Sequence, residues 1–154
     1  MVKWDRLLSA ERVIVGLRAT RKFDAIRELA AVIEGDAAVG DYNRFLADII
    51  KREKQGSTEI GYGVAIPHVH EEYIQRQILA LGISQKGIDF QGMGDTLVRI
   101  VAFFASPRKH QKQHMELLAA LSRQLQTETT RERFISAKDA AEVIEVVTGV
   151  VQPV

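Results

Sequence analysis

Four short apolar runs, rich in branched residues and separated by segments of helical period, constrain the fold of this chain more than any other feature. The runs are RVIVGL (12–17), VAIPH (64–68), QILALGIS (77–84) and LVRIVAFFA (97–105). Apolar runs of this length and composition are typical of buried strands. Strands interleaved with helices predict an α/β protein, organised as a three-layer α/β/α sandwich with a mixed central sheet flanked by helices.

Apolar residues at helical spacing predict the remaining elements. The pattern covers residues 22–35, 41–55, the segment from Pro107 onward, and shorter stretches near 128–135 and 138–147. We expect Thr20 to cap the first helix and Gly35 to end it. In the segment after Pro107, one apolar stripe is expected to comprise Met115, Leu118, Leu121 and Leu125.

Proline and glycine residues predict where strands end. Pro67 has no N–H to donate to a neighbouring strand, so we expect it to stop the strand at 64–68. Gly87, Gly92 and Gly94 are expected in the loop that joins the last two apolar runs.

Length and composition indicate one domain over residues 1–154 and exclude several classes of protein. The 154 residues are 46% hydrophobic, which is enough for one core, and 21 Lys and Arg balance 20 Asp and Glu. A net charge of +1 with no long basic block gives no indication of nucleic-acid binding. The chain has no cysteine, no apolar run that could span a bilayer and no signal-peptide pattern, so we expect a cytoplasmic protein without membrane insertion.

The four histidines fall in two pairs, and the residues alone leave two interpretations open. His68 and His70 share one face of a strand, and His110 and His114 share one face of a helix, so together they could bind a metal ion. In the second interpretation one neutral imidazole at a strand end is a nucleophile. Arg52, at a helix end upstream, is then a candidate to supply the positive charge that a phosphoryl group requires.

The string STEIGYGVAIPHVH, with REK upstream and HMELLAALSRQL downstream, resembles the type-2 EIIA family of the phosphoenolpyruvate:sugar phosphotransferase system. This family contains the fructose- and mannitol-specific IIA domains and the nitrogen-regulatory IIA proteins. The residues that match its signature are Ser57, Thr58, Gly61, Gly63, Ala65, Ile66, Pro67 and His68. The likeness extends over nearly the whole chain, from the DAIRELA helix to the histidine that opens the helix after ASP.

The resemblance implies a role for three residues. His68 is the expected phosphorylated nucleophile, His114 the second histidine that donates a hydrogen bond to the phosphoryl oxygens, and Arg52 the nearby stabilising charge. The family also implies Nε2 as the phosphorylated nitrogen, and neither a cofactor nor a metal. His70 and His110 have no counterpart in this set, so we interpret both as ordinary surface or satisfied side chains.

The resemblance also implies the partners. HPr or an HPr-like carrier would donate the phosphoryl group, and a cysteine of a IIB domain would accept it. The absence of cysteine in this chain indicates that IIB is a separate protein. Two alternatives stand beside this sugar-transport function: a nitrogen-regulatory IIA that controls a partner protein through its phosphorylation state, and a histidine-lined metal-binding protein.

Two residues depart from the family pattern. Val69 follows the expected active histidine, where a glycine or another small residue is usual, and we expect it to alter the loop or the docking surface, to which Tyr62 would also contribute. Glu59 replaces the first glycine of STGIG, and we expect its carboxylate to face solvent or to pair with a cation such as Arg52.

Overall fold

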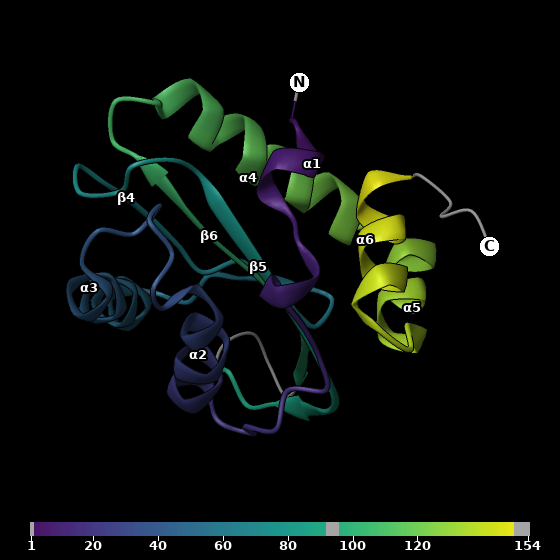
Figure 1. Cartoon of the computed structure of the whole chain (residues 1–154). Coiled ribbons are helices and arrows are strands. Elements are labelled where there is room, and N and C mark those ends of the chain that lie inside the picture. Colours follow the sequence, from purple (N-terminus) through teal and green to yellow (C-terminus); the bar gives the residue numbers. More distant parts are fainter. Residues whose placement is uncertain (1, 92–95, 150–154) are drawn as a thin grey trace.

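The structure is a computed structural model that describes residues 2–91 and 96–149, and it shows a mixed six-stranded sheet between two layers of helices (Figure 1). The strands are β1 (Val13–Val15), β2 (Glu59–Gly61), β3 (Val64–Ala65), β4 (His68–Glu71), β5 (Ile78–Ile88) and β6 (Val98–Pro107). The helices are α1 (Trp4–Leu7), α2 (Lys22–Ala30), α3 (Tyr42–Gln55), α4 (Gln111–Leu125), α5 (Glu128–Ser136) and α6 (Ala140–Thr148), with short 3₁₀ turns η1 (Ala10–Arg12) and η2 (Ala31–Ile33).

The sheet has the order β1-β5-β6-β3-β2, and β4 also pairs with β6. β5 is antiparallel to β6, whereas β3 and β4 are parallel to it, so the sheet is mixed as predicted. Alternate residues of β5 and β6 enter two separate cores. One core packs against α2 and α3, and the other packs against α1, α4, α5 and α6. The three-layer prediction is therefore confirmed.

Pro67 lies between β3 and β4, which both pair with β6. Val64 and Ala65 lie opposite Ile100 and Val101 of β6, and His68 lies opposite Phe104, so the register continues unchanged across the proline. As predicted, the strand stops before the proline, because β3 ends at Ala65. The prediction did not include the renewed pairing that follows, in which the carbonyl of Pro67 accepts a hydrogen bond from the Phe104 N–H at 3.1 Å. The chain therefore resumes as β4, with His68 as its first residue.

Some predicted helix details differ from the structure. The N-cap of α2 is Arg21 and not Thr20, whose carbonyl instead accepts a hydrogen bond from the Asp89 N–H. On α4 the buried stripe includes His114, Leu117 and Leu121, and Met115 is 54% exposed. Leu121 and Leu125 of the predicted stripe are buried as expected, whereas His114 and Leu117 occupy the buried face in its first turns. Gly87 lies within β5, and Gly92 and Gly94 are outside the described residues.

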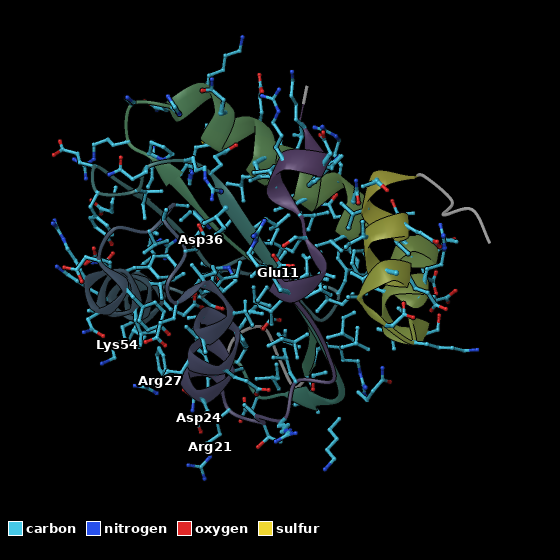
Figure 2. All side chains as sticks on the ribbon, in the orientation of Figure 1. Glu11, Arg21, Asp24, Arg27, Asp36 and Lys54 are labelled. Carbon is cyan, nitrogen blue, oxygen red and sulfur yellow. The ribbon has the colours of Figure 1, made fainter. Side chains whose placement is uncertain are left out.

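None of the described helices is long and apolar enough to cross a membrane. Charged side chains, including those of Arg21, Asp24, Arg27 and Lys54, project outward from α2 and α3 (Figure 2). Beneath this polar exterior the carboxylate of Glu53 is deeply buried, with the residue 2% exposed.

Glu53 connects α2, α3 and the loop that leads to the sheet. Its carboxylate lies 2.9 Å from the Lys22 ammonium and accepts hydrogen bonds from the Thr58 N–H at 2.9 Å and from the Thr58 hydroxyl at 2.7 Å. Because Lys22 is also nearly buried, removal of either charge leaves the other uncompensated in the protein interior.

We therefore expect Glu53→Gln to lower the free energy of unfolding by about 3 kcal/mol, measured by urea denaturation. The double variant Lys22→Met/Glu53→Gln should recover part of this loss, because it no longer buries an unpaired ammonium. Asp24→Asn is the matched control: it breaks an exposed ion pair with Arg27 and should change the stability by less than about 0.5 kcal/mol. A cost for Glu53→Gln as small as that of the control would contradict a structural role for the buried pair.

Candidate active site around His68

A cavity of about 380 Å³ lies where β4, the last turns of α3 and the first turn of α4 meet. The residues that line it are Asp48, Lys51, Arg52, Gln55, His68, Val69, His70, Glu71 and His114. The three residues predicted as a site, His68, His114 and Arg52, thus border the same cavity although they come from three separate elements. The fourth histidine, His110, lines a different cavity.

The imidazole of His68 is held on two sides. Its Nδ1 lies 2.7 Å from the carbonyl oxygen of Ile66, and its ring stacks on Phe104 with 5.3 Å between centroids and 14° between planes. A carbonyl oxygen can only accept, so Nδ1 carries the proton and Nε2 carries the lone pair when the ring is neutral. Burial lowers the pKa of His68 below 6.5. The hydrogen bond to Ile66 opposes this shift, and the positive charge of Arg52 adds to it.

A chain of hydrogen bonds links this imidazole to the buried carboxylate of Glu53. Glu53 accepts from Thr58, the carbonyl of Thr58 accepts from the Ile66 N–H at 3.0 Å, and the carbonyl of Ile66 accepts from His68. The Thr of the sequence motif therefore anchors the backbone that orients the histidine.

Two more imidazoles stand beside His68. The ring of His114 is 5.4 Å from that of His68, and the ring of His70 stacks on His114 with 4.4 Å between centroids and 8° between planes. His114 is 5% exposed. Its burial, together with the proximity of His70 and His68, lowers its pKa from 6.5 to about 4, so His114 is neutral near pH 7.

The charges around the cavity favour an anion. Both carboxylates on its wall have partners: Asp48 accepts from the Tyr73 hydroxyl at 2.6 Å, and Glu71 pairs with Arg108 at 3.0 Å. The guanidinium of Arg52 donates to the carbonyl of Gly56 at 3.0 Å and retains its full charge. Lys51 lies next to it on α3 and adds a second positive charge to the wall of the cavity.

The structure bears on the expectations for three neighbouring residues. Glu59 is 8% exposed, so of the two positions expected for its carboxylate the solvent-facing one is wrong. Val69 is 5% exposed and points into the core on the α2 and α3 side, because strand alternation turns it away from the face that carries His68. Val69 therefore adds little exposed surface, although it borders the His68 cavity. Tyr62, six residues before His68 along the chain, is 63% exposed. Its ring lies under the guanidinium of Arg131 on α5.

His70 lines the His68 cavity, although we interpreted it from the sequence as an ordinary surface or satisfied side chain. Its position two residues after His68 predicts a shared strand face, and that signal was sufficient to place it at the site. Its Nε2 is buried and has no hydrogen-bond partner among the described residues. Within residues 2–91 and 96–149, no group of three or more His, Asp or Glu side chains is arranged to hold a metal ion.

Comparisons with known proteins show the family to which the chain belongs. The family model described as "Phosphoenolpyruvate-dependent sugar phosphotransferase system, EIIA 2" matches residues 6–149. The chain is 30% identical over 131 residues to the fructose-specific EIIA component of Haloferax volcanii, with 85% of each chain covered. It is 25% identical over 150 residues to a nitrogen regulatory protein of Pseudomonas aeruginosa, with 97% of each chain covered.

Solved structures show the same fold. The nitrogen regulatory protein IIA-Ntr from Neisseria meningitidis superposes with a TM-score of 0.85 at 22% identity, over 92% of this chain and 97% of that one. Enzyme IIAMTL, in its complex with phosphorylated enzyme IIBMTL from Escherichia coli, superposes with a TM-score of 0.79 at 23% identity, over 93% of this chain and 98% of that one.

The fold and the match over residues 6–149 define the class of the protein: it is a IIA-type component of a phosphotransferase system. The chain belongs to the EIIA 2 family of the phosphoenolpyruvate-dependent sugar phosphotransferase system. It is also 26% identical over 146 residues to the fructose-specific EIIABC component of Bacillus subtilis. There the match covers 95% of this chain but only 23% of the relative's length.

The lowered pKa of His114 predicts how stability depends on pH. The unfolded chain binds a proton at this residue below about pH 6.5, whereas the folded chain binds it only near pH 4, so the free energy of unfolding should fall as the pH drops from 6.5 to 4. Urea denaturation at a series of pH values measures the fall, and NMR titration of the ring should give a midpoint near 4. His114→Phe keeps a buried ring without titration and should show a smaller fall. An equal fall would assign the pH dependence to other groups.

Proposed function

We propose that this protein is a phosphoryl carrier in which Nε2 of His68 accepts a phosphoryl group and passes it on. The observation that carries the proposal is the state of the His68 ring. Its proton is on Nδ1, its lone pair is on Nε2, and it borders a cavity whose carboxylates are paired and whose cations form no ion pair with a described residue. Membership of the EIIA 2 family supports the same reaction.

The donor is the phosphohistidine of HPr or of an HPr-like carrier. As Nε2 of His68 bonds to phosphorus, the donor's N–P bond breaks and its electron pair stays on the donor's ring nitrogen. Positive charge grows on the His68 ring, and the Ile66 carbonyl stabilises it through the Nδ1–H that it already accepts. The proton therefore does not have to leave, and catalysis consists mainly of positioning and charge stabilisation.

Three neighbours of His68 have distinct roles in this proposal. Arg52 supplies positive charge to the phosphoryl oxygens, and its guanidinium does not lose its proton at any physiological pH. His114 donates a hydrogen bond to those oxygens from a ring that is neutral before the reaction. His70, stacked on His114, holds that ring in place.

If the function is sugar transport, a cysteine of a separate IIB component accepts the phosphoryl group from His68. The thiolate attacks phosphorus, the bond to Nε2 breaks, and His68 returns to its neutral state with the proton still on Nδ1. The IIAMTL–IIBMTL complex supports a partner of this kind, because a IIA protein of the same fold binds a IIB protein there. The proposal places the protein in the cytoplasm.

A second function is favoured by one comparison. The Pseudomonas aeruginosa relative matches over 97% of both chains and is named a nitrogen regulatory protein. In that case the chemistry at His68 is the same, and the phosphorylated protein controls a partner by binding it. Transfer of the phosphoryl group from His68 to a fructose-type IIB cysteine would favour transport. Stable phosphorylation in the presence of IIB would favour regulation.

Incubation with phosphoenolpyruvate, enzyme I and HPr should label the wild-type protein with one acid-labile, base-stable phosphate. His68→Ala should abolish the label, because no other imidazole on the cavity has its Nδ1 fixed by a carbonyl and Nε2 left as the lone pair. Circular dichroism should show that His68→Ala is folded. A wild-type protein that stays unlabelled with a competent donor, or a variant that labels fully, would refute the mechanism.

The roles of His114 and His70 are separated by rapid-quench measurements of phosphoryl transfer. His114→Ala should slow transfer about 100-fold through loss of a donor to the phosphoryl oxygens. His70→Ala should slow it about tenfold, which is about 1.4 kcal/mol, whereas His70→Phe keeps a flat ring against His114 and should stay near the wild-type rate. His110→Ala is the matched control and should have no effect. Equal rates for His70→Ala and wild type would remove His70 from the site.

A further inference from the structure

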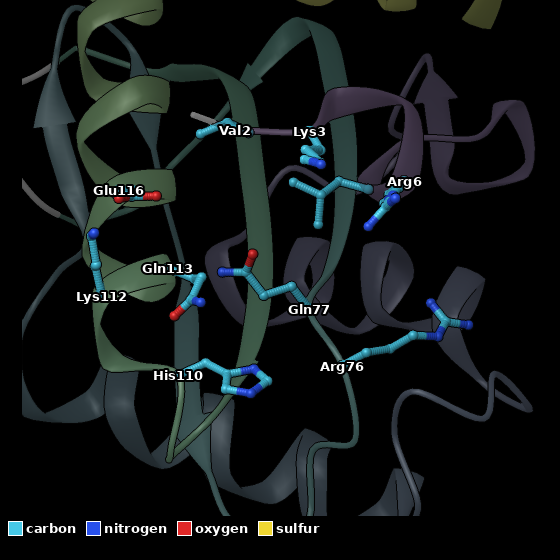
Figure 3. Close-up of a pocket in the computed structure, with 10 residues that line it drawn as sticks. Val2, Lys3, Arg6, Arg76, Gln77, His110, Lys112, Gln113 and Glu116 are labelled. Atoms are coloured by element: carbon cyan, nitrogen blue, oxygen red, sulfur yellow. The ribbon is translucent and has the colours of Figure 1, made fainter.

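A second cavity, of about 610 Å³, lies between α1, the start of β5 and the first turns of α4 (Figure 3). It is larger than the His68 cavity and shares no lining residue with it. The first turns of α4 border both: His114 lines the His68 cavity, and His110, Lys112 and Gln113 line this one. The mechanism at His68 does not use it.

Positive charge predominates on the wall of this second cavity. Lys3, Arg6 and Lys112 line it and form no ion pair with a described residue, whereas Arg76 is held by Asp36 at 3.0 Å. Glu116 is the one carboxylate among the described lining residues. Because the three cations are well exposed and hydrated, a single negative charge would gain little from them, and a dianion would gain more.

Amide groups face the same space. Gln77 projects from the residue just before β5, and Gln113 projects from α4 (Figure 3). The Nε2 of Gln77 donates to the Ser106 hydroxyl at 2.9 Å, which orients the amide so that its oxygen is the group left to accept a hydrogen bond. Together with the ring of His110, these amides offer both donors and acceptors, the combination that binds hydroxyl groups.

We propose that this cavity binds a small phosphate monoester that carries several hydroxyl groups, such as a sugar phosphate. The dianionic phosphate would lie near Lys3 and Arg6, and the hydroxyl groups would bond to the amides of Gln77 and Gln113. Val2 and Leu7 provide an apolar side to the cavity, and its volume is in the range of small-molecule sites. The inference concerns binding alone and does not depend on phosphorylation of His68.

The test is an NMR titration of the full chain with glucose 6-phosphate, with glucose and inorganic phosphate as separate arms. The ester should bind saturably and shift the amide signals of Gln77 and Gln113, and each of the other two compounds should bind at least about tenfold more weakly. Lys3→Gln/Arg6→Gln should weaken binding of the ester about tenfold or more. Lys86→Gln removes an exposed cation elsewhere on β5 and should have no effect. If the double variant does not fold, Lys112→Gln tests the same charge from α4.

Three results would overturn the proposal. The first is the absence of saturable binding by the ester. The second is binding of inorganic phosphate as tight as that of the ester, which would indicate a general attraction for anions. The third is binding that survives Lys3→Gln/Arg6→Gln but is lost in Arg52→Gln, which would place the anion at the His68 cavity. Each result is independent of the phosphotransfer assay, so failure here leaves the proposed function of His68 untouched.

Discussion

The arrangement of this protein depends on the pairing of one strand, β6, with three neighbours. β6 is buried along both faces, pairs antiparallel with β5, and pairs in parallel with β3 and β4 on its other edge. The unchanged register across Pro67 places His68 directly opposite Phe104. Because the same strand contributes side chains to both cores, a shift of its register would displace the helices on both faces as well as the histidine.

Around the cavity the structure favours the neutral form of His68 and His114 and gives each carboxylate a partner. Burial lowers the pKa of both His68 and His114, and the acidic groups on the cavity wall are paired with Tyr73 and Arg108. An incoming phosphoryl group therefore meets positive charge from α3 and does not meet uncompensated negative charge. This arrangement requires a cluster of polar groups in the interior. The hydrogen bonds from Thr58 to the buried Glu53 carboxylate hold the backbone that carries this cluster.

The first turns of α4 border both cavities. The side chain of His114 borders the His68 cavity, whereas Lys112 and Gln113 border the larger cavity beside α1. Side chains at neighbouring helix positions point in different directions, so one turn of helix can contribute to two sites without any residue belonging to both. The second pair of histidines in the sequence is divided in the same way, with His110 on the larger cavity and His114 on the cavity that His68 and His70 also line.

The sequence by itself determined the α/β layering, because apolar runs of strand length and helical spacing are local patterns. The resemblance carried by the signature ending in Pro67-His68 implied that His68, His114 and Arg52 act together, and the structure places all three on one cavity. The sequence could not decide which other residues surround His68. The burial of Glu59, the inward turn of Val69 and the stacking of His70 on His114 depend on the pairing of distant strands and on how α4 is rotated. Only the tertiary structure fixes these contacts, since they join segments that no local pattern connects.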